Sequence, residues 1–258
     1  MSIALLSVCL LALWLLSLKL RDSSIIDPFW GPAFSVLYWP EALAHGLGPR
    51  SLLVGGLVSL WGLRLGAYLA WRNWGHGEDK RYTAMRRRHG AAWWWRSLFI
   101  VFALQGVLAF IVASPIRAVA QQDPVTPLGP IDGVALALVV IGIAFESIGD
   151  LQLARFKARP QNRGRVCDQG LWRYTRHPNY FGDFCVWWGL WLVTVPTVVG
   201  LAAVVGPIVM SLFLMKVSGV PMLERMIGKR RPGYEEYVRR TNAFFPGPPK
   251  APAAEGGA

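Results

Sequence analysis

The chain alternates long apolar runs with short polar segments rich in Lys and Arg. Seven of the apolar runs have the length of a membrane-spanning helix, about 20 residues each. They are Ser2–Leu20, Ile25–Leu47, Ser51–Trp71, Ser97–Val119, Leu128–Leu153, Tyr180–Val199 and Leu201–Val220. The pattern predicts an all-α polytopic membrane protein with about seven transmembrane helices. We expect a single transmembrane domain over residues 1–246 and a disordered tail, rich in Pro, Gly and Ala, over residues 247–258.

Two of these runs carry further signals. The first has no basic segment before it and no small-residue cleavage site after it, so we expect a retained span and not a cleaved signal peptide. The second contains Asp27, Pro28, Pro32, Pro40 and Glu41. We therefore expect a broken or tilted helix there, whose freed backbone groups face protein or water.

The composition agrees with membrane insertion. Hydrophobic residues make up 53% of the chain and charged residues only 16%, against about 25% charged in globular proteins. The formal net charge is +12, but the basic residues lie between the apolar runs, which indicates membrane topology and no nucleic-acid partner. The three cysteines and four histidines are scattered, so their spacing predicts neither a disulfide framework nor a metal site.

The distribution of Lys and Arg predicts the orientation of the chain. Basic residues concentrate in residues 72–96, 155–176 and 225–240, and loops of this kind stay on the cytoplasmic side of a membrane. Seven spans with the N-terminus outside place all three segments in the cytoplasm, together with Lys19 and Arg21. An even number of spans does not.

Acidic residues inside a span mark the first candidate site, because a charge in the membrane interior is costly. Glu146 and Asp150 are four residues apart, on one face of the fifth span and near its cytoplasmic end. They fit hydrogen bonding to a polar ligand at the cytoplasmic mouth of the bundle. An ion pair with a neighbouring span is the other explanation.

The densest polar stretch leads directly into the sixth span. Pro178 suits the first turn of a helix, which puts Asn179 and Asp183 on its opening turns. A helix start with Arg176 and His177 beside it is a good anion site, and phosphate is its natural ligand. Contact with anionic lipid headgroups would also explain the basic residues, but not Asn179 or Asp183. A dinucleotide carries phosphates, hydroxyls and an amide, and would use both kinds of residue.

The common nucleotide-binding motifs are absent. No G-x-G-x-x-G follows a strand, and neither G-x-x-x-x-G-K-[ST] nor H-E-x-x-H occurs. This argues against a Rossmann domain, a P-loop and a zinc protease site. Loops and helix ends must hold any nucleotide that binds.

Several motifs together resemble the steroid 5α-reductase family. The matching segments are Asp27–Gly31, Trp61–Arg64, Arg72–Gly75, Asp150, Gly170–Asp183 and Gly233–Pro246. The later segments are similar to the C-terminal domain of these enzymes, above all in the bacterial branch labelled a domain of unknown function. The resemblance covers nearly the whole chain. The Arg-His-Pro element alone is less specific, because isoprenylcysteine carboxyl methyltransferases and sterol reductases share it.

The resemblance implies a seven-helix, NADPH-dependent reductase that transfers a hydride to the C=C bond of a lipid or steroid enone. NADPH would lie in a cavity facing the cytoplasm, held by the last helices and their loops. Asn179 and Asp183 would contact its nicotinamide and ribose side, and basic residues its phosphates. The implied cofactor-binding residues are Glu146, Asp150, Arg155, Lys157, Arg165, Tyr174, Arg176, His177, Asn179 and Asp183.

The substrate side departs from the family pattern. Animal enzymes place a Gln-Glu pair on the second helix and a Tyr on the third to hold the steroid carbonyl, and this chain has no Gln-Glu pair. Asp27 and Glu41 in the second span, and Trp61 near the position of that Tyr, are the remaining catalytic candidates. Two alternatives stay open: an S-adenosylmethionine-dependent methyltransferase of the isoprenylcysteine type, and a non-enzymatic lipid-binding membrane protein.

Overall fold

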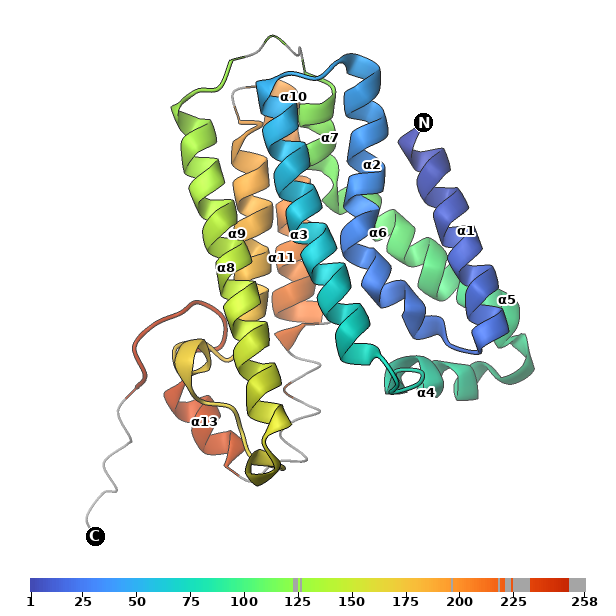
Figure 1. The fold of residues 1–258 in the computed structure, drawn as a ribbon, viewed down its shortest axis with the longest axis vertical. Helices are drawn as coiled ribbons and strands as arrows, with labels where there is room; N and C mark the ends of the chain where they lie inside the picture. The colour runs from blue at the N-terminus through green and yellow to red at the C-terminus, as the bar shows by residue number, and fades with distance from the viewer. Residues whose placement is uncertain are drawn as a thin grey trace. The chain divides into compact units, whose positions relative to one another are not determined.

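The structure is a computed structural model, and it describes residues 1–122, 125, 127–195, 197–217, 219–220, 224 and 233–250. All regular secondary structure in these residues is helical. The chain divides into two compact units, a first unit of residues 1–132 and 193–206 and a second unit of residues 133–192 and 207–258 (Figure 1). The first half of the predicted cytoplasmic segment at 225–240, residues 225–232, and the tail from residue 251 onward lie outside the described residues.

The first unit contains helices that pack side by side. Its elements are α1 (Ser2–Leu20), η1 (Ser23–Phe29), α2 (Trp30–His45), α3 (Pro49–Asn73), α4 (Lys80–His89), η2 (Gly90–Ala92), α5 (Trp93–Ser97), η3 (Leu98–Ala103), α6 (Leu104–Val112), α7 (Ser114–Ala120) and α10 (Val198–Ala202). Helix α2 packs between α1 and α3, and α7 packs on α2 and α3. Phe34, Tyr38 and Trp61 are fully buried in this core.

The second unit contains one long helix, α8, and several shorter elements. Its elements are most of α8 (Pro130–Ala158), η4 (Pro160–Asn162), η5 (Gly170–Arg173), α9 (Pro178–Leu192), most of α11 (Val205–Leu212), η6 (Phe213–Val217) and α13 (Tyr234–Arg240). An extended segment, residues 241–250, follows α13. Figure 1 shows α13 beside the loop that joins α8 to α9.

The predicted all-α membrane fold is confirmed. Among the described residues, five helical stretches are long and apolar enough to cross a membrane: Ser2–Leu20, Pro49–Asn73, Lys80–Val112, Pro130–Ala158 and Val198–Val217. The other two predicted spans correspond to α2, with 16 residues, and α9, with 15, which are shorter than the roughly 20 residues a span requires. The count of seven therefore stays a prediction. The second span begins as the 3-10 helix η1, which contains Pro28, and continues as the α-helix α2, which contains Pro40 without a break.

A buried ion pair fixes one end of the first unit. Arg50 at the start of α3 donates from Nε and Nη2 to the two carboxylate oxygens of Asp132 in α8, at 3.1 and 2.8 Å. The backbone N–H of Gly129 donates to the same carboxylate at 2.7 Å. Both carboxylate oxygens of Asp132 therefore accept from Arg50, and such hydrogen bonds offset the cost of burying the two charges.

Helices α2 and α3 cross at two glycines. A Cβ atom on Gly31 would lie 2.2 Å from the carbonyl oxygen of Gly62, and one on Gly62 would lie 2.5 Å from the carbonyl oxygen of Gly31. Both distances are far below van der Waals contact, so only glycine permits this crossing. Small residues serve in this way in membrane proteins, where close backbone packing drives the association of helices.

We predict that Gly62→Ala destabilises the protein by about 1–3 kcal/mol, the usual range for overpacking. Gly56 on the same helix is a matched control, because a Cβ there meets nothing within 4 Å. Gly56→Ala should be neutral or stabilising by up to about 1 kcal/mol, since alanine favours helix. Thermal unfolding of the purified variants in detergent measures both effects. Equal melting temperatures for the two variants would contradict the crossing.

Candidate functional site

Helices α8 and α9 of the second unit pack closely through glycines. A Cβ on Gly142 would lie 2.5 Å from the carbonyl oxygen of Gly182, and one on Gly182 would lie 2.5 Å from the carbonyl oxygen of Gly142. The contact continues toward the end of α8 and the start of α9. A Cβ on Gly149 of α8 would lie 3.1 Å from the ring of Pro178, the first residue of α9. The two helices thus run side by side from the start of α9 (Figure 1).

This packing brings the acidic residues of α8 to the opening turns of α9. The amide Nδ2 of Asn179 donates a long hydrogen bond of 3.5 Å to Oδ1 of Asp150. A Cβ built on Gly182, the residue before Asp183, would lie 2.7 Å from the Cγ atom of Glu146. Glu146 and Asp150 are only 2% and 5% exposed. The predicted start of α9 and the shared buried face of the two acids are therefore both found in the structure.

The loop before α9 is fixed to the backbone of α8. The indole Nε1 of Trp172 donates to the carbonyl oxygen of Gly149 at 2.9 Å. The backbone N–H of Leu171 donates to Oε1 of Gln152 at 2.9 Å. Gly170 adopts a positive φ of 59°, and the Gln152 amide fills the space that a Cβ would need. These contacts hold the chain against α8 immediately before α9 begins.

Arg176, a predicted phosphate ligand, points into the protein. Its Nε donates to Oε1 of Glu224 at 2.8 Å, and its Nη1 donates to the carbonyl oxygens of Val238 and Thr241 at 3.1 and 2.6 Å. The residue is 9% exposed. In this arrangement Arg176 joins the start of α9 to the end of α13.

His177 and Tyr174 also contact residues of the second unit. His177 is buried, and its Nε2 lies 3.3 Å from the same oxygen of Glu224. Its imidazole stacks on the ring of Tyr180 with a centroid separation of 5.4 Å. Tyr174 is exposed, and its carbonyl oxygen accepts a hydrogen bond from the backbone N–H of Gly247 at 3.1 Å. A role of these two residues in cofactor binding stays a prediction.

Glu224 is the acid that balances Arg176. Burial alone would raise the pKa of Glu224, but hydrogen bonds from His177 and Arg176 and the charge of Arg176 hold the pKa below its usual range. The carboxylate is therefore ionised at neutral pH, and the contact with Arg176 is an ion pair.

The extended segment after α13 covers the beginning of α9. Thr175 Oγ1 donates to the carbonyl oxygen of Phe244 at 2.7 Å. The rings of Phe244 and Phe245 pack on those of Phe181 and Phe184, with centroids 5.6 to 6.4 Å apart. Aromatic contacts of this kind add about 0.5–1.5 kcal/mol per pair beyond the area they bury. They hold the segment against the first two turns of α9.

The remaining predicted phosphate ligands are exposed. Arg155 and Lys157 lie in the last turn of α8, and Arg165 lies in the loop that follows. Arg173, in η5, is exposed as well. No cluster of His, Cys, Asp or Glu suited to a metal ion occurs in the part of the chain that the structure describes.

The catalytic candidates of the first unit do not converge. Asp27 accepts hydrogen bonds from Arg81 Nη2 at 2.8 Å and from the Tyr82 hydroxyl at 2.6 Å. Glu41 lies 3.4 Å from Arg117 Nε. The two acids lie near opposite ends of the run formed by η1 and α2, roughly 20 Å apart by the rise per helical residue. They cannot bind one carbonyl together.

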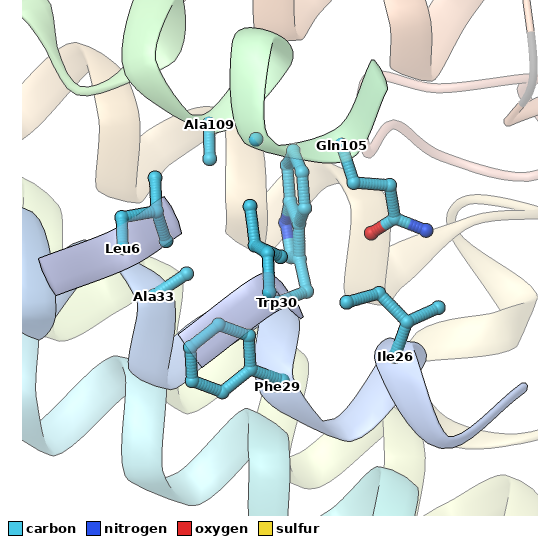
Figure 2. A pocket seen from close by; sticks show the side chains of 9 residues that line it. Leu6, Ile26, Phe29, Trp30, Ala33, Gln105 and Ala109 are labelled. Carbon is cyan, nitrogen blue, oxygen red and sulfur yellow. The ribbon is translucent and has the colours of Figure 1, made fainter. Parts of the chain in front are cut away.

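Trp61, the third catalytic candidate, lies in the core of the first unit, and so does a small cavity. Trp61 is fully buried and packs on Phe34, with ring centroids 5.6 Å apart. Figure 2 shows a small cavity between α1, η1, α2 and α6, where Gln105 is the polar side chain among apolar ones such as Trp30 and Ala109. Its volume is about 10 Å³, which is about the size required for one water molecule. This cavity does not hold a steroid in the described conformation.

Three residues that contribute to the site were not predicted from the sequence. Gly142 and Gly182 set the distance between α8 and α9, and a small residue in each of two neighbouring spans was the available signal. Glu224 is an acid within a strongly basic stretch, which suggests a local partner but does not identify Arg176.

We predict that Arg176→Gln lowers the free energy of unfolding by roughly 2–3 kcal/mol. Loss of one partner from a buried ion pair costs about 3–5 kcal/mol, and Glu224 retains 25% exposure of its side chain, which reduces the effect. Arg173→Gln is the matched control, because Arg173 is exposed. Thermal unfolding in detergent is the measurement. An unchanged melting temperature for Arg176→Gln would show that Arg176 does not hold the segment in place.

Two comparisons with known proteins find similar sequences that cover most of the chain. A family described as "Protein of unknown function (DUF1295)" matches residues 13–241. The uncharacterized protein C594.04c of Schizosaccharomyces pombe is 25% identical over 264 residues, which cover 91% of this chain and 75% of the yeast protein. No solved structure gives a significant match. The chain belongs to the DUF1295 family, which is related to steroid 5α-reductase-like membrane proteins.

Proposed function

We propose that the chain is a membrane-embedded reductase that uses NADPH to reduce the C=C bond of a lipid or steroid enone. The observation that carries the proposal is the meeting of α8 and α9, which brings Glu146 and Asp150 together with the first turns of α9, where Asn179 and Asp183 lie. Buried acids in a membrane helix are retained where they bind something polar. The relation of the family to steroid 5α-reductase-like proteins supports the same function.

The donors and acceptors of this site suit the nicotinamide and ribose of NADPH. Carboxylates such as Asp150 and Asp183 accept hydrogen bonds from ribose hydroxyls, and the Asn179 amide both donates and accepts, as a carboxamide requires. Asn179 and Asp183 are half-buried. The proposed site therefore orients the reactive end of the cofactor at the first two turns of α9.

Exposed basic residues at the end of α8 suit the phosphates. Arg155 follows Asp150 by little more than one helical turn, roughly 7.5 Å of rise. Lys157, Arg165 and Arg173 are exposed in the same unit. The planar fork of an arginine binds phosphate oxygens well. We assign the phosphates to these residues, because Arg176 is buried and its Nε and Nη1 donate to Glu224 and two backbone carbonyls.

The protein's part in the proposed reaction is orientation and the exclusion of water. NADPH, when bound, supplies the hydride. Asn179 and Asp183 would fix the position of the nicotinamide, and Phe244 and Phe245 would shield the start of α9 from water. Arg176 and His177 act as positioning residues, because they hold Glu224 and the segment after α13 in place.

We expect Asn179→Ala and Asp183→Ala to lower turnover by about a hundredfold, because a displacement of about 1 Å at the reacting centre has an effect of that size. NADPH affinity should fall much less, since each variant loses only one of several contacts. The measurement is NADPH oxidation by detergent-purified protein with a 4-ene-3-keto steroid, together with NADPH binding to each variant.

Gln169→Ala is the matched control for these variants. Gln169 lies in the same unit and is exposed, and its side chain makes no capping hydrogen bond to η5. Its turnover should equal that of the wild-type protein. Wild-type turnover in both Asn179→Ala and Asp183→Ala would remove these residues from the active site. Methyl transfer from S-adenosylmethionine in place of reduction would favour the isoprenylcysteine-type methyltransferase.

A further inference from the structure

Helix α4 differs in composition and direction from the other helices of the first unit. Five of its ten residues are Lys or Arg. Asp79 caps its start, and Gly90, with a positive φ of 52°, ends it. Figure 1 shows α4 lying across the end of α3 and not alongside it. A helix with this many basic residues does not enter the hydrocarbon region of a membrane. We therefore place α4 at the membrane–water boundary, between α3 and the apolar helices that follow.

The inner face of α4 is fixed by carboxylates. Arg86 donates to both oxygens of Glu78, from Nη2 at 2.7 Å and from Nε at 3.0 Å. Arg81 Nη2 and the Tyr82 hydroxyl both donate to Asp27 of η1. Burial alone would raise the pKa of Glu78, but hydrogen bonds from Arg86 and Ser23 hold it below its usual range. These contacts prevent α4 from rotating about its axis.

The fixed rotation directs a second set of basic residues outward. Lys80, Arg87 and Arg88 are exposed, and their spacing of seven and eight residues places them on one helical face. In the described part of the chain, none of the three forms an ion pair or a side-chain hydrogen bond. The neighbouring side chains Trp94 and Trp95 are 60% and 42% exposed.

We propose that this outer face of α4, formed by Lys80, Arg87 and Arg88, binds the phosphates of anionic phospholipids in the adjacent leaflet. The charge is complementary, and each basic residue close to an anionic membrane surface raises the affinity about fivefold. Exposed tryptophans mark the level of the headgroups. The exposed neighbours on the helix, Ala84 and Met85, offer no side-chain acceptor for a ribose or a base. The face thus fits a lipid headgroup better than a nucleotide.

The test compares lipid binding to the delipidated full chain by native mass spectrometry. Phosphatidylglycerol and phosphatidylcholine with identical acyl chains are the two probes. The wild-type protein should bind phosphatidylglycerol at least about tenfold more tightly, and Lys80→Gln/Arg87→Gln/Arg88→Gln should lose most of this preference. The matched control is Arg159→Gln/Arg163→Gln/Arg239→Gln, which removes three exposed basic residues of the second unit and should keep the preference. Unchanged melting temperatures confirm that both variants fold.

Three results would overturn the proposal. The first is an undiminished preference in the α4 variant. The second is an equal loss of preference in the control variant, since this would show that the preference depends only on the net charge of the protein. The third is displacement of phosphatidylglycerol by inorganic phosphate or by 2′,5′-ADP, since either would identify the face as a site for soluble phosphate compounds. Because no cofactor is present in this experiment, its outcome does not depend on the proposed reductase activity.

Discussion

The close approach of α8 and α9 is the constraint on which the proposed site depends. Lipid chains are as apolar as leucine, so a membrane helix gains little from burying apolar surface against another helix, and tight backbone contact must stabilise the pair. Gly142 and Gly182 permit that contact, since each carbonyl oxygen occupies the space of a side chain on the other helix. A larger residue at either position would push the two helices apart. Asp150 and Asn179 would then no longer be within hydrogen-bonding distance.

A second level of structure holds the entrance to this cluster. Arg176 and His177 share the carboxylate of Glu224, and Arg176 also binds the carbonyl oxygens at the end of α13. The following segment then returns to α9 through Thr175 and the phenylalanine contacts. The Arg-His-Pro element thus serves as a structural junction in this chain.

Much of this arrangement could be predicted from the sequence, where the pattern depends on neighbours along the chain. The length of α1, the start of α9 at Pro178 and the shared face of Glu146 and Asp150 all follow from local periodicity and helix-end preferences. The direction of the Arg176 side chain could not be predicted, because its partner Glu224 lies 48 residues away. The partners of Asp27 could not be predicted for the same reason, because Arg81 and Tyr82 lie 54 and 55 residues away.

The proposed cofactor is tested most directly by finding which small molecule stabilises the purified chain. A ligand that binds only the folded protein raises its stability by about 2.7 kcal/mol at a concentration one hundred times its Kd. Thermal unfolding should therefore be measured with NADPH, with NADH and with S-adenosylmethionine. We expect a large increase in melting temperature with NADPH, a smaller one with NADH, and none with S-adenosylmethionine. An increase with S-adenosylmethionine and none with NADPH would contradict the proposed cofactor.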